Sequence, residues 1–313
     1  MLIKNRTFFL LISLLLIGTL PALAQKKFSF FAIGDMPYHN PEDIVKFKKL
    51  TQALNGEKTA FTVHVGDIKN GKTECSDQYF RMIRDLFNQF KAPLIYTPGD
   101  NEWTDCARPS CGGYDPAERL DALRKIFFKN DQSLGQKPLN LRSQHTSPGF
   151  EEFVENVMWR KEGITFATLH VVGSNNNLKV QGENTNEEFL KRDEANLHWL
   201  SEIFKNARAH NDVAIVIVMQ AAMTYAHNVQ NGFTNIVEKL RTEVKSFEKP
   251  VLVIYGDHHR FQISKPLTDP DENLIQNFTA LMVFGDSDMN AVKIDVDPKS
   301  KQVFSFSEFL IAY

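Results

Sequence analysis

Residues 28–38 read FSFFAIGDMPY, a short apolar run that ends in Gly34-Asp35. The same arrangement of an apolar run and a polar stop returns several times along the chain. Runs that are apolar throughout, without alternation, indicate strands buried on both faces of a sheet. The repeated pattern therefore predicts a layered α/β fold. The other runs span 61–65, 93–96, 164–172, 213–219, 251–255 and 280–284.

Helical segments are predicted between these strands. The stretch Asn40-Pro41-Glu42-Asp43 is typical of a helix start, with Asn as the cap, Pro in the first turn and acidic residues beside it. Asp115-Pro116-Ala117-Glu118 predicts a second start through a capping box. The connection 103–163 is long, and we expect it to form a cap or insertion beside the site, within a single domain that spans 25–313. Further helices are expected near 77–90, 187–208 and 235–247.

The composition restricts the class of protein. The chain has 313 residues, of which 42% are hydrophobic and 24% are charged. These values are typical of a globular protein with a full core, and they exclude collagen-like, low-complexity and strongly disordered chains. Lys and Arg number 36 against 38 Asp and Glu. This balance gives no sign of a nucleic-acid-binding surface.

The N-terminus has the features of a signal peptide, predicted over residues 1–24. Lys4 and Arg6 precede an apolar stretch from 8 to 20, and Ala22-Leu23-Ala24 is a small-residue cleavage site. The apolar stretch is short for a membrane span, which needs roughly 20 residues. An uncleaved N-terminal anchor is the alternative interpretation. We expect an exported protein, periplasmic or secreted, with no stable membrane anchor after cleavage.

Export makes a disulfide between two of the three cysteines an expectation. Cys75 and Cys106 each lie a few residues beyond a predicted strand end. Neighbouring strands would bring the two loops together, so we predict a bond between these residues. The alternative pairing, Cys106 with Cys111, would close a smaller local loop.

Polar residues follow the predicted strands, at the edge where open α/β sheets bind ligands. Several carboxylates in one crevice repel one another and resist burial unless cations neutralise them. The pattern therefore predicts a metal site with two ions and one bridging carboxylate. The alternative treats each Gly-Asp as a turn signal, as we do for Gly285-Asp286. The side chains at these positions are Asp35, Asp67, Asn101, Gln220, Asp257 and His259.

These motifs resemble those of the calcineurin-like metallophosphoesterases. That family carries Gly-Asp-x-His, Gly-Asp-x-x, Gly-Asn-His-Asp/Glu, an isolated His and Gly-His-x-His, each at the end of a strand. The order is similar here over most of the chain after residue 25. The resemblance implies a four-layer α/β/β/α sandwich with two central mixed β-sheets and a metal site at the carboxyl ends of the strands. It implies a first metal held by Asp35 and His259, a bridge by Asp67, and a second metal held by Asn101, Gln220 and Asp257.

Four positions depart from the family pattern, because Pro37, Glu102, Gln220 and Asp257 stand where the family has His. These departures resemble an exported bacterial branch with Gly-Asp-x-Pro-Tyr and Gly-Asp-Asn-Glu motifs. His259 is then the sole nitrogen donor among the expected ligands. Oxygen-rich sites favour Mn²⁺, Mg²⁺ or Ca²⁺ over zinc, and iron stays open.

The resemblance implies an exported metal-dependent hydrolase, in which activated water attacks a phosphate mono- or diester. Its substrate is expected to be a phosphorylated small molecule or lipid. The catalytic candidates are Glu102, Asn101 and His258, with His39 as a further possible general acid. For Glu102, the alternative role is a hydrogen bond that orients Asn101. The alternative function is a catalytically weakened relative that binds metal or a phosphorylated ligand.

Residues 66–73, GDIKNGKT, also match the P-loop expression of nucleotide-binding proteins. Asp67 would place a carboxylate where the phosphates rest in a P-loop. The following helix is predicted to begin at Ser76 or Asp77, so Lys72 and Thr73 would lie in a loop and not at the helix start. We therefore do not expect nucleotide binding.

Overall fold

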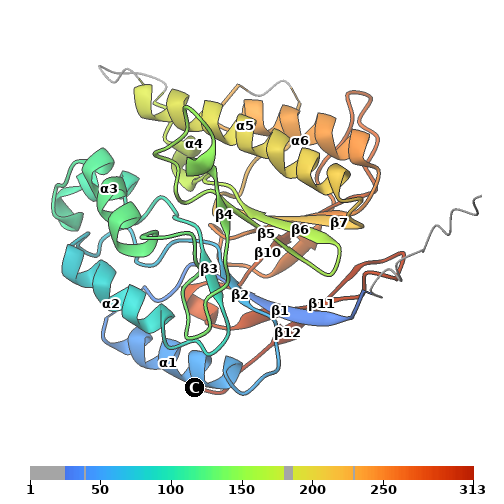
Figure 1. Ribbon diagram of the computed structural model, residues 1–313. Helices are drawn as coiled ribbons and strands as arrows, with labels where there is room; N and C mark the ends of the chain where they lie inside the picture. Colours follow the sequence, from blue (N-terminus) through green and yellow to red (C-terminus); the bar gives the residue numbers. More distant parts are fainter. Residues whose placement is uncertain (1–24, 39, 180–185, 228–229) are drawn as a thin grey trace, which may run out of the picture.

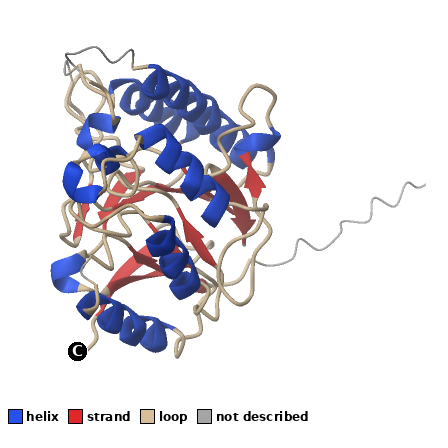
Figure 2. Cartoon of the chain, turned by 90° about the vertical axis from the view of Figure 1, so that its left-hand side faces the viewer, coloured by secondary structure: helices blue, strands red, loops and turns tan. Residues whose placement is uncertain are grey.

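The computed structural model describes residues 25–38, 40–179, 186–227 and 230–313. Two mixed β-sheets lie face to face between two groups of helices (Figure 1, Figure 2). The predicted signal peptide falls outside the described residues. Within them, no helix is long and apolar enough to cross a membrane.

The first sheet has five strands, and the run at 28–33 lies at its centre. This strand, β1, pairs in parallel with β2 and antiparallel with β11. β2 continues in parallel to β3. In spatial order the strands are β12 (Phe304–Phe309), β11 (Ala291–Val296), β1 (Phe28–Ile33), β2 (Thr62–His64) and β3 (Leu94–Tyr96).

The second sheet has seven strands with a parallel centre. β6, β7, β8 and β10 run parallel, while β5 and β9 pair antiparallel on either side of them. In spatial order the strands are β4 (Arg142–Ser143), β5 (Val157–Lys161), β6 (Ile164–Thr168), β7 (Ala214–Val218), β8 (Val251–Tyr255), β10 (Phe278–Met282) and β9 (Gln262–Ser264).

The helices cover the outer faces of both sheets. α1 (Glu42–Leu54), α2 (Asp77–Phe87) and α3 (Pro116–Phe127) pack on the first sheet, and α5 (Glu187–Ala209) and α6 (Thr234–Phe247) pack on the second. β1 shows why two buried faces need an apolar run: Phe31 and Ile33 face the helices, whereas Phe30 and Ala32 face the other sheet. The shorter helices are α4 (Gly173–Asn176), η1 (Thr104–Ala107), η2 (Pro109–Cys111), η3 (Gln144–Thr146) and η4 (Asp286–Asp288).

The predicted helix starts are confirmed with one correction. Asp115 caps α3 by accepting hydrogen bonds from the N–H groups of Ala117 and Glu118. Ser76 caps α2, which leaves Lys72 and Thr73 in a loop and excludes a P-loop. The correction concerns α1, where Pro41 occupies the N-cap and no side chain caps the helix, so Asn40 does not have its expected role.

The long connection 103–163 divides between the two halves of the fold. Its first part forms η1, η2 and α3, and α3 packs beside α2. Its second part forms β4 and β5, which extend the second sheet at one edge. This connection therefore contributes core structure as well as the loops that follow β3.

Cys75 and Cys106 form a disulfide, as predicted, and Cys111 is a buried free thiol. Replacing both bonded cysteines by Ser is expected to lower the free energy of unfolding by roughly 3–4 kcal/mol, because the bond joins residues 31 positions apart. Urea unfolding measures the loss. Cys111→Ser is the control, since Ser can keep the hydrogen bond that the thiol donates to the carbonyl of Gly71. Equal losses in the two variants would contradict the prediction.

Candidate metal centre

The strand ends of both sheets place polar side chains at one edge of the fold. Asp35 follows β1, Asp67 follows β2, and Asp257 follows β8. All three have positive φ angles, of 51°, 54° and 77°. This region is unusual for a residue with a Cβ, and such conformations cluster at functional sites.

Two glycines allow the carboxylates of Asp67 and Asp35 to lie against the backbone of neighbouring loops. A Cβ on Gly99 would lie 2.0 Å from Oδ1 of Asp67, and a Cβ on Gly256 would lie 2.1 Å from Oδ2 of Asp35. Any larger residue would displace the carboxylates. Gly99 and Gly256 are therefore needed for close packing of these carboxylates against the backbone, and not only for a turn.

Asp67 is the shared acceptor of the cluster. Its Oδ2 accepts hydrogen bonds from the Tyr38 hydroxyl at 3.1 Å, from Nδ2 of Asn101 at 2.9 Å and from Nε2 of Gln220 at 3.2 Å. Its Oδ1 accepts the backbone N–H of Asn101 at 3.2 Å. These contacts bring residues from both sheets to one carboxylate.

Gln220 has a fixed amide orientation. It is fully buried, and its Oε1 accepts the backbone N–H of Gly173. Because a backbone N–H can only donate, the amide nitrogen of Gln220 must face Asp67. Asn101 also turns its amide nitrogen toward Asp67, and this nitrogen lies 3.2 Å from the Tyr38 hydroxyl.

His259 is held by Asp286, which the sequence pattern predicted to be only a turn residue. Its Nδ1 lies 2.7 Å from Oδ1 of Asp286. Its Nε2 points inward, 3.1 Å from the Tyr38 hydroxyl and 3.6 Å from Oδ1 of Asp35. A carboxylate behind an imidazole is the usual arrangement around a metal-binding His, because it fixes the tautomer and orients the ring.

Asp35 carries an unsatisfied carboxylate oxygen. Its Oδ1 accepts the backbone N–H of Asp257 at 3.0 Å, but its Oδ2 is buried without a hydrogen-bond partner in the described part of the chain. Asp35 itself is fully buried. A buried carboxylate oxygen without a donor is costly, so a cation bound at this atom would relieve the cost.

Burial and mutual repulsion perturb the acids of this region. Burial, above all, raises the pKa values of Asp35, Asp67, Asp100 and Glu102, and neighbouring carboxylates raise them further. Burial likewise raises the pKa of the Tyr38 hydroxyl, with added repulsion from Asp67. Grouped acids with raised pKa values are typical of functional sites, and a bound cation would offset their mutual repulsion.

The catalytic candidates lie in different surroundings. The Glu102 carboxylate is fully buried and accepts hydrogen bonds from the Tyr96 hydroxyl and the Gly99 N–H, both at 2.7 Å. Asn101 is half-buried at the mouth of the cluster, beside Asp67. His258 is exposed in the loop after β8. His39 falls outside the described residues.

The donor set fits divalent cations in its chemistry. The cluster combines carboxylate oxygens, among them the unpartnered Oδ2 of Asp35, with one oriented imidazole, and this combination suits Mn²⁺, Mg²⁺ or Ca²⁺. Across the described residues, no three His, Cys, Asp or Glu side chains already converge tightly enough to hold a metal ion. In this arrangement Oδ2 of Asp67 accepts hydrogen bonds from Tyr38, Asn101 and Gln220.

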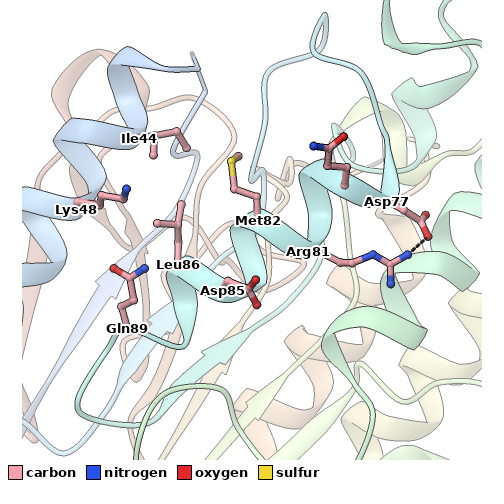
Figure 3. Close-up of a pocket in the computed structure, with 9 residues that line it drawn as sticks. Ile44, Lys48, Asp77, Arg81, Met82, Asp85, Leu86 and Gln89 are labelled. Carbon is pink, nitrogen blue, oxygen red and sulfur yellow. Dashed lines mark hydrogen bonds and ion pairs between the residues drawn. The ribbon is translucent and has the colours of Figure 1, made fainter.

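A surface groove of about 700 Å³ lies elsewhere, between α1 and α2 (Figure 3). Ile44, Met82 and Leu86 give it an apolar floor, and the ion pair of Arg81 with Asp77 lies at one end. None of its lining residues belongs to the strand-end cluster. The groove is thus separate from the candidate centre.

The fold is shared with solved structures of distant sequence. A dimetal phosphatase from Danio rerio aligns with a TM-score of 0.54 at 11% identity, covering 90% of this chain and 99% of its own. GAP50, the anchor in the inner membrane complex of Plasmodium, aligns with a TM-score of 0.51 at 14% identity, covering 92% of this chain and 90% of its own. At this identity the likeness establishes the fold alone.

Comparison by sequence adds no relative. No protein-family model matches the chain. No curated protein matches it either.

Proposed function

We propose that this protein is an exported metal-dependent hydrolase of phosphate mono- or diesters. The observation that carries the proposal is the buried strand-end cluster, in which several acids lie grouped and Oδ2 of Asp35 has no hydrogen-bond partner among the described residues. The fold shared with a dimetal phosphatase supports the same conclusion. A phosphorylated small molecule or lipid is the proposed substrate.

Asp35, Asp67, Asp257 and His259 would hold the cations, with Asp67 between the two positions. Bound divalent cations would polarise the phosphoryl oxygens and lower the pKa of a water molecule. Asn101 lies half-buried at the mouth, where its amide would donate to a phosphoryl oxygen in place of the hydrogen bond that it gives to the Tyr38 hydroxyl. The floor is closed by Asp35, Tyr38 and Gln220, which are buried, so substrate must approach from the side of Asn101 and His259.

The contacts of Glu102 support a positioning role. Both of its hydrogen bonds are made within the loop from Tyr96 to Glu102, and they hold the backbone of Gly99 against Asp67. A carboxylate used in this way orients Asn101 and does not reach substrate. His258, which is exposed, is the better placed of the two for proton transfer to a leaving group.

Export is part of the proposal. The leader-like composition of residues 1–24 supports it, and so does the disulfide between Cys75 and Cys106, since disulfides persist in oxidising compartments.

A second candidate function is a catalytically weakened member of this fold that binds a metal or a phosphorylated ligand. The inward amide nitrogen of Gln220 favours it, because an amide nitrogen is no metal ligand. The likeness in fold to GAP50, an anchor protein, also supports it.

Hydrolysis assays separate the two candidates. The purified protein is incubated with an aryl phosphate monoester and an aryl phosphate diester, with added Mn²⁺ or with a chelator. We expect turnover with Mn²⁺ and none with chelator. The ratio of the hydrolysis rates of the monoester and the diester then shows which of the two ester classes the protein prefers. If the protein hydrolyses neither ester with Mn²⁺, Mg²⁺, Ca²⁺, Zn²⁺ or iron, the result favours the binding function instead.

A further inference from the structure

Polar groups from two loops border a small space above Gly71. This glycine lies in the loop after β2, whereas Asp105 lies in η1 and Arg108 directly follows η1. A Cβ on Gly71 would lie 2.5 Å from Nη1 of Arg108, 3.1 Å from Oδ2 of Asp105 and 3.3 Å from Oδ1 of Asn101. The glycine thus leaves open a space beside Asn101, at the mouth of the candidate centre, that a single methyl group would fill.

The loop that carries Gly71 is tied to the strand-end cluster. Nδ2 of Asn70 donates to the backbone carbonyl of Tyr38 at 3.0 Å. Its Oδ1 accepts the N–H groups of the two residues after Gly71, at 2.8 and 2.9 Å. Tyr38 in turn donates to Asp67. Residues 66–73, which do not form a P-loop, therefore hold Gly71 next to the cluster.

Arg108 is held through one nitrogen of its guanidinium. Nη1 lies 2.6 Å from Oδ2 of Asp105 and donates to the carbonyl of Gly71 at 3.2 Å. The backbone carbonyl of Arg108 accepts the N–H groups of Cys111 and Gly113. Within the described part of the chain Nε and Nη2 donate no hydrogen bond, and the side chain is 51% exposed. Two guanidinium nitrogens in one plane match two oxygens of a phosphate group.

Cations gather around Asp105, in contrast to the acids of the cluster. Burial, above all, raises the pKa of Asp105 to about 6, and three nearby cations, Arg108, Lys69 and Lys179, oppose this rise. Lys69 also donates to the backbone carbonyl of Asn101 at 2.7 Å. Because several cations lie near one carboxylate, this side of the mouth attracts anions.

Asn101 links the cluster to the space above Gly71. Its Nδ2 donates to Asp67, whereas its Oδ1 borders this space and accepts no hydrogen bond from the described residues. A phosphoryl group bound at the Asn101 amide would therefore lie beside Arg108. A phosphate monoester has one more non-bridging oxygen than a diester, and it carries a second negative charge at neutral pH. Both features favour a contact with the guanidinium.

We propose that Arg108, next to the space above Gly71, binds the phosphoryl group of the substrate together with Asn101, so that the protein prefers phosphate monoesters to diesters. This proposal rests on the proposed function, and it selects one of the two ester classes. A second ester substituent would replace an oxygen that Arg108 binds and would remove one negative charge.

The test compares two probes that contain no ester bond. Phenylphosphonate has the charge and the three terminal oxygens of a monoester, and methylphenylphosphinate has the single charge and the two terminal oxygens of a diester. Isothermal titration calorimetry measures their binding to the purified protein with Mn²⁺. Wild type is expected to bind phenylphosphonate at least about 10-fold more tightly than the phosphinate. Arg108→Gln is expected to lose about 10-fold in affinity for phenylphosphonate and less than about twofold for the phosphinate.

Three further variants sharpen the comparison. Gly71→Ala should also lose the preference, because the new Cβ displaces the flexible end of Arg108. Arg108→Lys, which keeps the charge without the planar pair of nitrogens, should bind phenylphosphonate with intermediate affinity. Arg81→Gln is the matched control, since Arg81 is 55% exposed and pairs with Asp77 at 2.6 Å on α2, and it should keep the preference of wild type.

Equal binding of the two probes by wild type, or binding of neither, would overturn the proposal. An unchanged preference in Arg108→Gln would overturn it as well. Circular dichroism checks that this variant is folded, and Gly71→Ala and Arg108→Lys provide the test if it is not.

Hydrolysis of the aryl monoester and diester is assayed separately. If Arg108→Gln abolishes the preference between the probes but wild type hydrolyses neither ester, the proposed function is refuted and the role of Arg108 in binding stands. If wild type hydrolyses both esters with equal efficiency, the role of Arg108 is refuted and the hydrolase stands.

Discussion

Asp67→Asn is expected to lower turnover of aryl phosphates by at least about 1000-fold in the presence of Mn²⁺. Asp67 accepts hydrogen bonds from Tyr38, Asn101 and Gln220, and it is the one carboxylate positioned between the two proposed cations. Loss of the shared ligand removes several kcal/mol of charge stabilisation in the transition state. About 4 kcal/mol corresponds to the stated loss.

The control for this substitution is Asp193→Asn. Asp193 is also a buried Asp with a pKa raised by burial, but it lies on α5 and binds Asn235 of α6. Turnover by this variant should stay within about twofold of wild type, since it contacts no residue of the cluster. Steady-state kinetics with both variants gives the comparison. An Asp67→Asn protein as active as the control would exclude Asp67 from the reaction.

Stability measurements show whether Asp67→Asn loses activity because a ligand is removed or because the protein no longer folds. The pKa of Asp67 is raised by burial and by Asp100 and Glu102, above its ordinary value of 3.8. Between 3.8 and the raised value, the folded state binds more protons than the unfolded state, so stability in chelator falls as the pH rises. Asp67→Asn removes this penalty. The metal-free variant should therefore be more stable than wild type at neutral pH, and the gain should vanish as the pH falls toward 3.8.

The strands around the centre could be predicted from sequence because they are buried on both faces. The run at 251–255 coincides with β8, and the run at 28–33 coincides with β1. The buried part of each strand, 30–33 in β1 and all of β8, is apolar, so the end of the apolar run and the polar stop mark the end of the strand. β12 (Phe304–Phe309) was missed, because its alternating exposure at the edge of the first sheet gives no continuous apolar run.

The roles of individual acids could not be predicted in the same way. Asp286 follows the same Gly-Asp pattern as Asp35, yet it supports His259 from behind. Asp100 and Asn101 are neighbours in the sequence, but they make different contacts. The carboxylate of Asp100 accepts a hydrogen bond from the Ser174 hydroxyl, and Ser174 lies in a left-handed turn that is distant in sequence. These differences depend on contacts between segments distant in sequence, which no local motif encodes.

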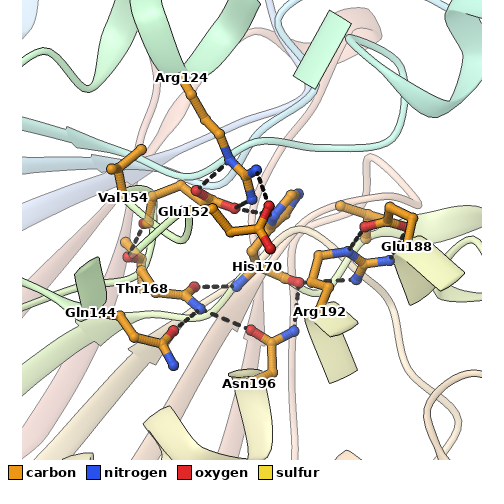
Figure 4. Close-up of polar contacts among 12 residues, drawn as sticks. Arg124, Gln144, Glu152, Val154, Thr168, His170, Glu188, Arg192 and Asn196 are labelled. Carbon is orange, nitrogen blue, oxygen red and sulfur yellow. Dashed lines mark hydrogen bonds and ion pairs between the residues drawn. The ribbon is translucent and has the colours of Figure 1, made fainter. Parts of the chain in front are cut away.

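Glu155→Ala is expected to destabilise the protein by about 3–5 kcal/mol. Glu155 is fully buried and binds the largely buried Arg124 and the fully buried His170, both of which are labelled in Figure 4. Arg124 of α3 donates to it at 2.7 and 3.0 Å, and Nδ1 of His170 lies 2.8 Å away. Removing the carboxylate leaves the largely buried Arg124 guanidinium with only the exposed carboxylate of Glu152 beside it, and loss of a buried counter-charge produces destabilisation of that size.

Glu152→Ala is the matched control, because Glu152 contacts the same guanidinium from the surface. Its side chain is 58% exposed and lies 3.5 Å from Arg124. Exposed pairs contribute about 0–1 kcal/mol, so urea unfolding should distinguish the two variants clearly. Similar losses in both would mean that the buried position of Glu155 carries no extra stability.

The pH dependence of Glu155 gives an independent check of the same contact. Burial alone would raise the pKa of its carboxyl, but Arg124 and His170 hold that pKa well below its usual range. The stabilisation is therefore complete above the ordinary value of 4.5 and is lost as the pH falls below it. The difference in stability between wild type and Glu155→Ala should shrink under acid. A difference that stays constant from neutral pH to pH 3 would show that lost packing, and not charge, causes the destabilisation.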